Sequence, residues 1–497
     1  MHANLIKNFS FLSASSVLLP FTTMALVVAI SRLGGVEMLG QYSLLVTFFF
    51  FGQTCSTAGL QILLTRDVAR TRARAGAYLM SGTVIGFIAV VVISAILVPS
   101  FMWTVPGNDT RISLFLMAGS LFPTVVIAFA ESVLLAFERA EDFVVVGLVE
   151  SLARTIFGTA LVLAGFGIVA IAANFLLCRI GAAWATMRRV RHREPSLSLT
   201  FDWTCFRELS GQIPVVGSIP VLNSLYWRLD TLLLTWLRGL VDVGYYSAST
   251  RILDITRNLP QAYARALYPL LSRLHHEKDP EFERLSRDSI VWIVVATMPL
   301  ALATFSLAPW IITILYGEHM SAAITGLQIT AWLIIPYALT NTLAQILFAS
   351  GNQALDLRVN AAAVVANLTL NLALIPHWGF VGAASASLTS IMLHVSLQYR
   401  YVCQRIFDPA VLGPLARIAV VGLVSCVLTT AGIAVGYHAF VATGAGLTCY
   451  ALGLWAMGIV HREHLRTLRG YGATAVGKLL RERSARPLSA RQPPAVK

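Results

Sequence analysis

Apolar runs of about 20 residues recur along the whole chain, and short polar segments separate them. A helical run of this length spans the hydrocarbon core of a bilayer, whereas transmembrane β-strands are shorter and alternate. The pattern therefore predicts an all-α polytopic membrane protein with about fourteen spans. Their expected limits are 10–30, 42–63, 79–104, 112–136, 143–164, 168–187, 209–236, 243–271, 289–315, 322–349, 357–376, 381–402, 413–434 and 438–459.

The polar segments between these spans differ in charge in a regular way. Of the 37 Lys and Arg residues, 27 lie in alternate segments, which include both ends of the chain. The segments on the opposite side carry only Arg32, Arg111 and Arg238. Since cytoplasmic segments are enriched in Lys and Arg, we expect both termini to be cytoplasmic.

The composition supports a membrane protein and argues against a soluble protein or one that binds nucleic acid or a metal. The chain is 57% hydrophobic and 12% charged, with a mean hydropathy of +0.72, too apolar for a soluble protein of 497 residues. Topology explains the net charge of +13, so we expect no nucleic-acid partner. The six cysteines are too far apart for a metal or redox motif, and we expect no disulfide framework, metal site or cofactor.

Two pairs of similar segments indicate an internal repeat. LGQYS at 39–43 matches VGYYS at 243–247, and GIVAIAA at 167–173 matches GFVGAAS at 379–385, at nearly one offset. Repeated lobes around a central site are common among transporters. We expect an N-terminal six-helix lobe with a cytoplasmic loop at 1–207, and a C-terminal six-helix lobe at 208–402. Two additional helices at 403–460 and a basic cytoplasmic tail at 461–497 complete the chain.

Seven arginines and four acids fall inside predicted spans, where a charge persists only if it faces water or a partner. The eighth span contains RILDITRN at 251–258, and its polar residues are spaced 4, 3, 4, 3 and 4 apart, which places them on one helical face. A helix lying flat on the membrane surface is the alternative. The excess of positive charge predicts a cavity that attracts an anion, and arginine suits phosphate oxygens.

These positions define the candidate site. The candidate substrate-binding residues are Arg154, Arg179, Arg228, Arg251, Arg257 and Arg265. Glu150, Asp230 and Asp254 are candidates for coupling to an ion or for charge balance. Ser247, Asn258 and Gln261 are expected to line the cavity. Glu150 and Arg154 can also form a purely structural pair, because they lie four residues apart. We expect no catalytic residue.

Several motifs, in order, resemble the polysaccharide transporter branch of the multidrug/oligosaccharidyl-lipid/polysaccharide (MOP) exporter superfamily. They are LGQYSLL, GLQILLTRDVAR, WRLDTLLL, VGYYSASTRI, ALYPLLSRL and LNLALIPHWGFVGAASAS, over residues 1–460. The resemblance implies a MATE-like fold of two pseudo-symmetric six-helix lobes plus two extra helices. It also implies a flippase that moves undecaprenyl-pyrophosphate-linked oligosaccharides, such as O-antigen, exopolysaccharide or capsule units, by alternating access. The location would be the cytoplasmic (inner) membrane of a bacterium.

The resemblance also implies partners: the lipid-linked oligosaccharide, membrane lipid, a polysaccharide polymerase and a chain-length regulator. Three alternatives stay open. A cation-coupled multidrug antiporter would need a cavity lined mainly by acids. A peptidoglycan lipid-precursor flippase would bind a substrate with the same kind of anionic head group. A membrane-embedded polysaccharide polymerase would need a large outer loop with catalytic residues, and the expected outer loops are short. With no ATP-binding module or catalytic motif found, we expect a transporter and not an enzyme.

Overall fold

The computed structural model describes residues 2–105, 107–195 and 197–459, and their side chains apart from residues 2–21, 103, 104, 215, 219, 258, 259 and 265. The chain divides into two compact units, Met1–Pro409 and Ala410–Lys497. The predicted basic tail, 461–497, lies outside the described residues.

Within the described ranges every regular element is a helix, which confirms the all-α class. The α-helices are α1 (His2–Thr57), α2 (Leu60–Arg70), α3 (Ala75–Thr104), α4 (Asn108–Ala136), α5 (Ala140–Leu163), α6 (Ile168–Arg193), α7 (Trp203–Val216), α8 (Ser218–Leu237), α9 (Leu240–Thr256), α10 (Asn258–His276), α11 (Glu281–Ser306), α12 (Ala308–Tyr316), α13 (Ala323–Ala331), α14 (Ile334–Ala349), α15 (Gln353–Arg405), α16 (Leu412–Ala434) and α17 (Ala439–Ala456). Two 3₁₀ helices, Arg72–Arg74 and Glu318–Met320, join some of them.

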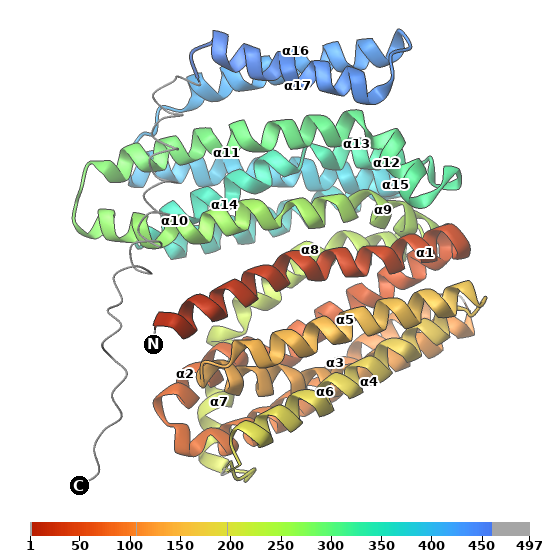
Figure 1. Cartoon of the computed structure of the whole chain (residues 1–497), viewed down its shortest axis with the longest axis vertical. Coiled ribbons are helices and arrows are strands. Elements are labelled where there is room, and N and C mark those ends of the chain that lie inside the picture. Colours follow the sequence, from red (N-terminus) through yellow and green to blue (C-terminus); the bar gives the residue numbers. More distant parts are fainter. Residues whose placement is uncertain (1, 106, 196, 460–497) are drawn as a thin grey trace, which may run out of the picture. The chain divides into compact units, whose positions relative to one another are not determined.

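Ten segments in the described ranges are long and apolar enough to cross a membrane. Two of these segments, α1 and α15, turn back at a glycine and thus contain two helices each (Figure 1). Gly379 has φ 56° and ψ −133°, a region open almost only to glycine, and a side chain there would also meet Asp242. The count of fourteen spans stays a prediction, because α7 to α10 are short or carry many polar residues.

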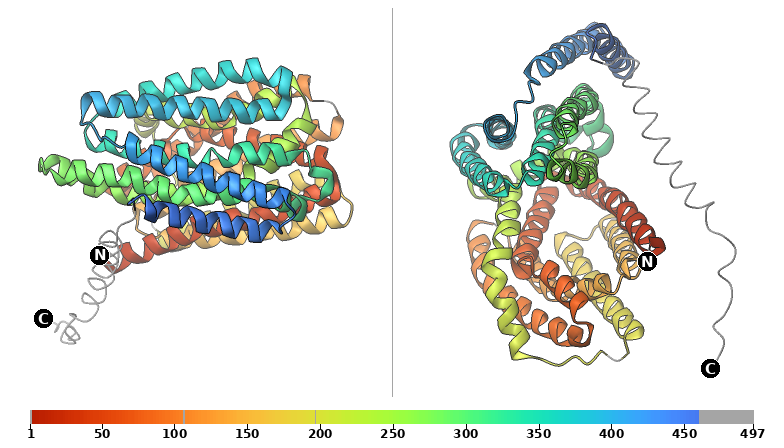
Figure 2. Two further views of the ribbon diagram at one scale, coloured as in Figure 1. Left: turned by 90° about the horizontal axis from the view of Figure 1, so that it is seen from above. Right: turned by 90° about the vertical axis from the view of Figure 1, so that its left-hand side faces the viewer.

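In the first unit, α1 and α3 to α6 pack on one another, and so do α8 to α15. Seen along the helices, these two groups lie side by side and meet where α1 packs against α8 and α9 (Figure 2). The predicted seventh span is divided at Gly217 into α7 and α8, and α7 contacts α2 and α3. The predicted domain limits themselves remain a prediction.

The segment before α7 is fixed by an ion pair outside the spans. Asp202 accepts a hydrogen bond from the Thr204 backbone N–H at 2.8 Å, which caps α7. Its other oxygen accepts from Arg74 at 3.0 Å. The Arg74 guanidinium holds the pKa of Asp202 at about 2, so this clamp persists at neutral pH.

The second unit contains α16 and α17, which form a hairpin stabilised by close contact between small residues. Gly446 lies against Thr429 and the backbone of Ser425, and Gly453 lies against Val421. Small residues let two helices approach closely, as is common in membrane proteins.

Candidate functional site

The repeated LGQYS and VGYYS segments meet where α1 crosses α9. The hydroxyl of Ser43 donates to that of Ser247 at 2.6 Å, and these two residues are separated by 204 positions, the offset of the repeat. A side chain on Gly40 would overlap the Leu240 carbonyl, and one on Gly244 would overlap the Val36 carbonyl. Because each contact has its counterpart at the same offset, the crossing is self-complementary, as in a two-fold interface.

Nearby, further contacts join α1 to α12 and to the 3₁₀ helix Glu318–Met320. The Arg32 guanidinium donates to the carbonyls of Ile314 and, at 3.0 Å, Leu315. The His319 ring lies 3.0 Å from the Ser31 carbonyl. The end of the bundle that holds Gly35, which the charge pattern assigns to the outer side, is therefore closed by polar contacts and tight backbone packing.

The predicted polar stripe of the eighth span falls on two helices, since the chain changes from α9 to α10 at Arg257. The helix does not lie flat on a surface: α9 packs between α1 and α13, where Ser249 donates to the Ala323 carbonyl at 3.0 Å. Of the predicted cavity-lining residues, Ser247 forms the crossing with Ser43, and Gln261 donates to the Tyr337 hydroxyl at 2.6 Å. The side chains of Asn258 and Arg265 lie outside the described ones.

Arg257 is held in place by an acid and by aromatic rings. Its guanidinium lies 3.1 Å from Asp254 and over the rings of Trp227, at 4.0 Å, and Tyr337, at 5.1 Å. Arg251 lies 3.8 Å from the same acid. The Nε atoms of both arginines are buried and lack a hydrogen-bond partner in the described structure. Both guanidinium groups therefore keep a donor for a further acceptor.

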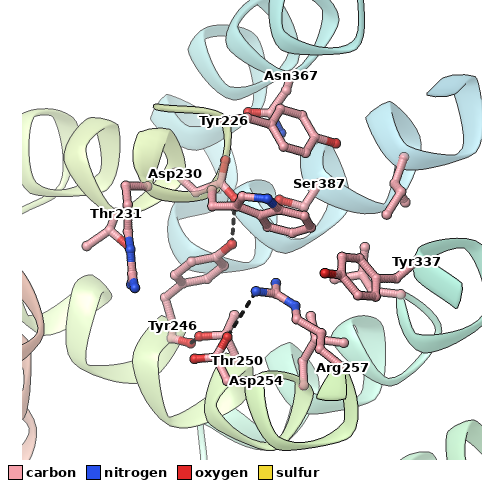
Figure 3. Close-up of a pocket in the computed structure, with 15 residues that line it drawn as sticks. Tyr226, Asp230, Thr231, Tyr246, Thr250, Asp254, Arg257, Tyr337, Asn367 and Ser387 are labelled. Atoms are coloured by element: carbon pink, nitrogen blue, oxygen red, sulfur yellow. Dashed lines mark hydrogen bonds and ion pairs between the residues drawn. The ribbon is translucent and has the colours of Figure 1, made fainter. Parts of the chain in front are cut away.

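A pocket opens between α8, α9, α14 and α15, and Arg257 points into it (Figure 3). Its charged lining residues are Arg228, Asp230, Asp254 and Arg257, together with Trp227, three tyrosines and Ser387. It encloses about 90 Å³, room for several waters. Two arginines face two acids, so the pocket itself has no positive excess. This pocket therefore does not match the predicted cavity, which was expected to be lined by arginines and to carry an excess of positive charge.

Arg228 differs from the other pocket arginine in its partners. Its guanidinium lies 5.0 Å from the ring centre of Phe50, on α1, and it forms no ion pair within the described part of the chain. A cation–π contact holds the group without neutralising its charge. Arg228 therefore brings an uncompensated positive charge to the place where α8 meets α1.

Asp230, which lies on α8 like Arg228, is surrounded by neutral hydrogen-bond donors. Its carboxylate accepts hydrogen bonds from the Tyr246 hydroxyl at 2.7 Å, the Asn371 amide at 2.7 Å and the Ser387 hydroxyl at 2.5 Å. Figure 3 shows Tyr246 aimed at it. Only 8% of Asp230 is exposed, and it has no ion pair in the described ranges. It thus does not balance an arginine by direct contact.

The remaining predicted site residues form a second cluster, away from this pocket. Glu150 on α5 lies 3.0 Å from Arg154 and 3.4 Å from Arg179 of α6. The guanidinium of Arg154 lies over Phe175, and that of Arg179 over Phe49 and Phe175. All three charged side chains are at most 15% exposed. The cluster therefore has the geometry of a buried ion triad that joins α5, α6 and α1.

Replacing Glu150 tests whether this triad is structural. We expect Glu150→Ala to lower the free energy of unfolding by about 3–5 kcal/mol, because it leaves two buried guanidinium groups without their acid. Equilibrium unfolding in mixed detergent and dodecyl sulfate micelles measures this difference. Glu283→Ala, at an exposed position of α11, is the matched control and should change nothing. Normal stability with lost transport would instead assign Glu150 to the transport cycle.

Sequence reasoning missed the groups that hold the charged residues. Trp227 and Tyr337 stack on Arg257, while Tyr246 and Ser387 donate to Asp230. Tyr246 lies in the repeated VGYYS segment, so the repeat was the available signal. The Asn367 amide donates to the Ser390 hydroxyl across the α15 hairpin at 3.1 Å.

Comparison with known proteins agrees with this architecture. Two curated relatives come from Haloferax volcanii: a probable low-salt glycan biosynthesis flippase, Agl15, 27% identical over 161 residues, and a probable flippase, AglR, 28% identical over 181 residues. The matches cover 32% and 35% of this chain, and 34% and 37% of the relatives. The chain thus spans about a third of the length of the curated relatives it matches.

Solved structures share the fold at low identity. The inward closed conformation of the lipid II flippase MurJ superposes with a TM-score of 0.75 at 13% identity, over 91% of this chain and all of that one. An inward-facing multidrug resistance MATE transporter of the MOP superfamily gives 0.63 at 15% identity, over 79% and 98%. The MATE-like fold class is thereby confirmed. The model of the family described as polysaccharide biosynthesis protein matches residues 29–325, more than half of the chain, and the chain belongs to that family.

Proposed function

We propose that this protein is a flippase that moves an undecaprenyl-pyrophosphate-linked oligosaccharide across the cytoplasmic membrane of a bacterium by alternating access. The observation that carries the proposal is the pair Arg228 and Arg257, which line one pocket in a fold shared with MurJ. Arg228 has no acid partner in the described structure, so an incoming diphosphate would supply its counter-charge. Family membership and the two probable flippases among the relatives support the same class.

Recognition of the diphosphate would use the preorganised arginine. Asp254 and the Trp227 ring fix the Arg257 guanidinium, so little side-chain freedom is lost on binding. Its unpartnered Nε, like that of Arg251, provides the second donor of a bidentate contact. Since about 90 Å³ is small for a head group with sugars, binding would require the helices around the pocket to move apart.

Ion coupling would use Asp230. A buried carboxylate without a basic partner is costly unless it binds a cation or a proton. The Asn371 amide that donates to it has an oxygen with no partner in the described structure. Turning this amide would present the oxygen to a bound cation, and the Ser387 and Tyr246 oxygens lie within reach. Entry of the ion and entry of the anion into one pocket would thus be linked by charge.

A multidrug antiporter uses the same fold, and the two acids of the pocket would suit an organic cation. The two functions differ in which residues transport requires. An antiporter would tolerate loss of the arginines, because they repel its substrate, whereas a diphosphate flippase would not.

Loss of either pocket arginine tests the proposed substrate. We expect Arg228→Ala and Arg257→Ala each to reduce glycan export about 10- to 100-fold, since a hydrogen bond to a charged group contributes about 1.5–3 kcal/mol. Complementation of a flippase-null strain, with surface glycan quantified against membrane expression, measures the effect. Arg238→Ala removes an exposed arginine, paired with Asp242 on the helix surface, and should export normally. Normal export by both pocket variants would contradict the proposal.

A further inference from the structure

A second polar site lies in the hairpin of α15, apart from the pocket described above. Asp356, in the first turn of α15, is 6% exposed. Its two oxygens accept hydrogen bonds from the Gln398 amide at 2.7 Å and the Asn360 amide at 2.9 Å. No basic residue pairs with Asp356 in the described ranges. A buried carboxylate with only amide neighbours has no basic side chain to balance its charge when it is ionised.

The amide of Gln398 shows that this arrangement is incomplete. Gln398 is 1% exposed, and its Oε1 has no hydrogen-bond partner among the described residues. The nitrogen and oxygen of one amide are interchangeable by a half turn. After that turn, Oε1 would face the Asp356 carboxylate, an arrangement that a cation between the two oxygens makes favourable.

The chemistry of the donors indicates which cation fits. One carboxylate supplies one negative charge, which a monovalent ion neutralises, while amide oxygens are hard, neutral ligands. A divalent ion prefers several carboxylates, and the described residues contain no group of three or more His, Cys, Asp or Glu that could hold a metal. A pocket of about 230 Å³, lined by Asp356, Asn360, the exposed Asn223 of α8 and several apolar side chains, lies beside the site.

A seam of polar residues connects this site with Asp230. On the first half of α15, Asp356, Asn360, Asn367 and Asn371 are spaced 4, 7 and 4 apart, and on the second half Ser387, Ser390, His394 and Gln398 are spaced 3, 4 and 4 apart. Each set therefore occupies one helical face. The bonds Gln398 to Asp356 and Asn367 to Ser390 join the two faces along their length, and Asn371 and Ser387 reach Asp230.

We propose that Asp356, Asn360 and Gln398 form a sodium site, and that the seam along α15 carries the ion between this site and Asp230. The sodium site itself stands without the proposed function, whereas the role of the seam rests on coupling at Asp230. His394 lies on the seam between the two ends, 6% exposed, with an unpartnered Nε2 within the described structure.

Equilibrium binding of ²²Na⁺ to the purified full-length protein in detergent, with choline as the replacing ion, tests the site. We expect Asp356→Asn to remove one of the sodium ions bound per molecule, and Gln398→Ala to weaken binding at that site at least tenfold. Asp109→Asn, at an exposed position of α4, is the matched control and should bind as the wild type does. Wild-type binding by both Asp356→Asn and Gln398→Ala, or no sodium binding by the wild type at millimolar concentration, would overturn the proposal.

Two further measurements keep the result interpretable. If Asp356→Asn does not yield folded protein, as judged by gel filtration, Asn360→Ala removes a ligand while leaving the carboxylate and should also weaken binding at least tenfold. Sodium binding and glycan export are then both measured for Arg228→Ala and Arg257→Ala. Normal export by those variants would refute the proposed substrate. It would leave the number of sodium ions bound per molecule unchanged, so the two proposals fail separately.

Discussion

Linking residues 43 and 247 by a disulfide should stop transport. In a background without the six native cysteines, all free thiols in the structure, we expect oxidised Ser43→Cys/Ser247→Cys protein to lose at least tenfold in export. The serine oxygens are 2.6 Å apart, so cysteines there can reach bonding geometry with small adjustments. The proposed alternating access requires the Gly35 end to open, and the α1–α9 crossing is a close backbone contact at that end.

The reason for so large an effect is the shape of the crossing. Gly40 and Gly244 each pack directly on a backbone carbonyl of the other helix, so the helices cannot slide past one another while in contact. Packed interfaces of this kind switch between discrete arrangements and do not deform continuously. A covalent bond beside these glycines therefore holds the whole end closed.

A second pair provides a matched control with the same geometry. Thr22 and Ser151 have hydroxyl oxygens 2.6 Å apart, but both belong to the group of helices that includes α1 and α5. We expect Thr22→Cys/Ser151→Cys to export normally when oxidised, because rigid-body movement of the two groups leaves this pair together. Export is measured in cells with and without a reductant, which should restore the first pair. Normal export by a fully oxidised 43–247 pair would show that transport does not require this end to open.

The sequence predicted the elements whose signals are local or repeated. Long apolar runs predicted the helices, and the LGQYS and VGYYS segments predicted two equivalent positions, which the structure places in contact through Ser43 and Ser247. The i, i+4 spacing of Glu150 and Arg154 predicted a pair that exists at 3.0 Å. Such features depend on residues close in sequence or on periodicity, so no tertiary information is needed.

What the sequence could not predict depends on partners far along the chain. Arg228 and Asp230 are two residues apart and so face different ways on a helix. Only packing against α1 gives Arg228 a phenylalanine ring, and only packing against α9 and α15 gives Asp230 its three neutral donors. Asp356 was missed for a different reason. The eleventh span was expected to begin at 357, whereas α15 begins at Gln353, and this small boundary error put a buried carboxylate in a loop.

Neutralising Asp230 should abolish ion-driven transport without unfolding the protein. Asp230→Asn resembles the uncharged form of the acid, and the hydroxyls of Tyr246 and Ser387 and the amide of Asn371 can all turn to suit it. We therefore expect the free energy of unfolding to change by only about 1 kcal/mol, comparable with one ordinary hydrogen bond. Export should fall at least tenfold, because the site can no longer supply the negative charge that attracts the ion.

The distinguishing measurement is transport in proteoliposomes with an imposed sodium or proton gradient. Wild-type protein should respond to one gradient, and Asp230→Asn to neither, whereas Asp109→Asn should behave as wild type because it lies exposed in the first turn of α4. Alanine at Tyr246 would confound the result by opening a cavity, so Tyr246→Phe, which removes one donor, is the better companion and should reduce export less than Asp230→Asn does. If Asp230→Asn keeps its gradient response, the charge of this carboxylate does not couple an ion to transport, and the three donors around it serve only to hold α8, α9 and α15 together.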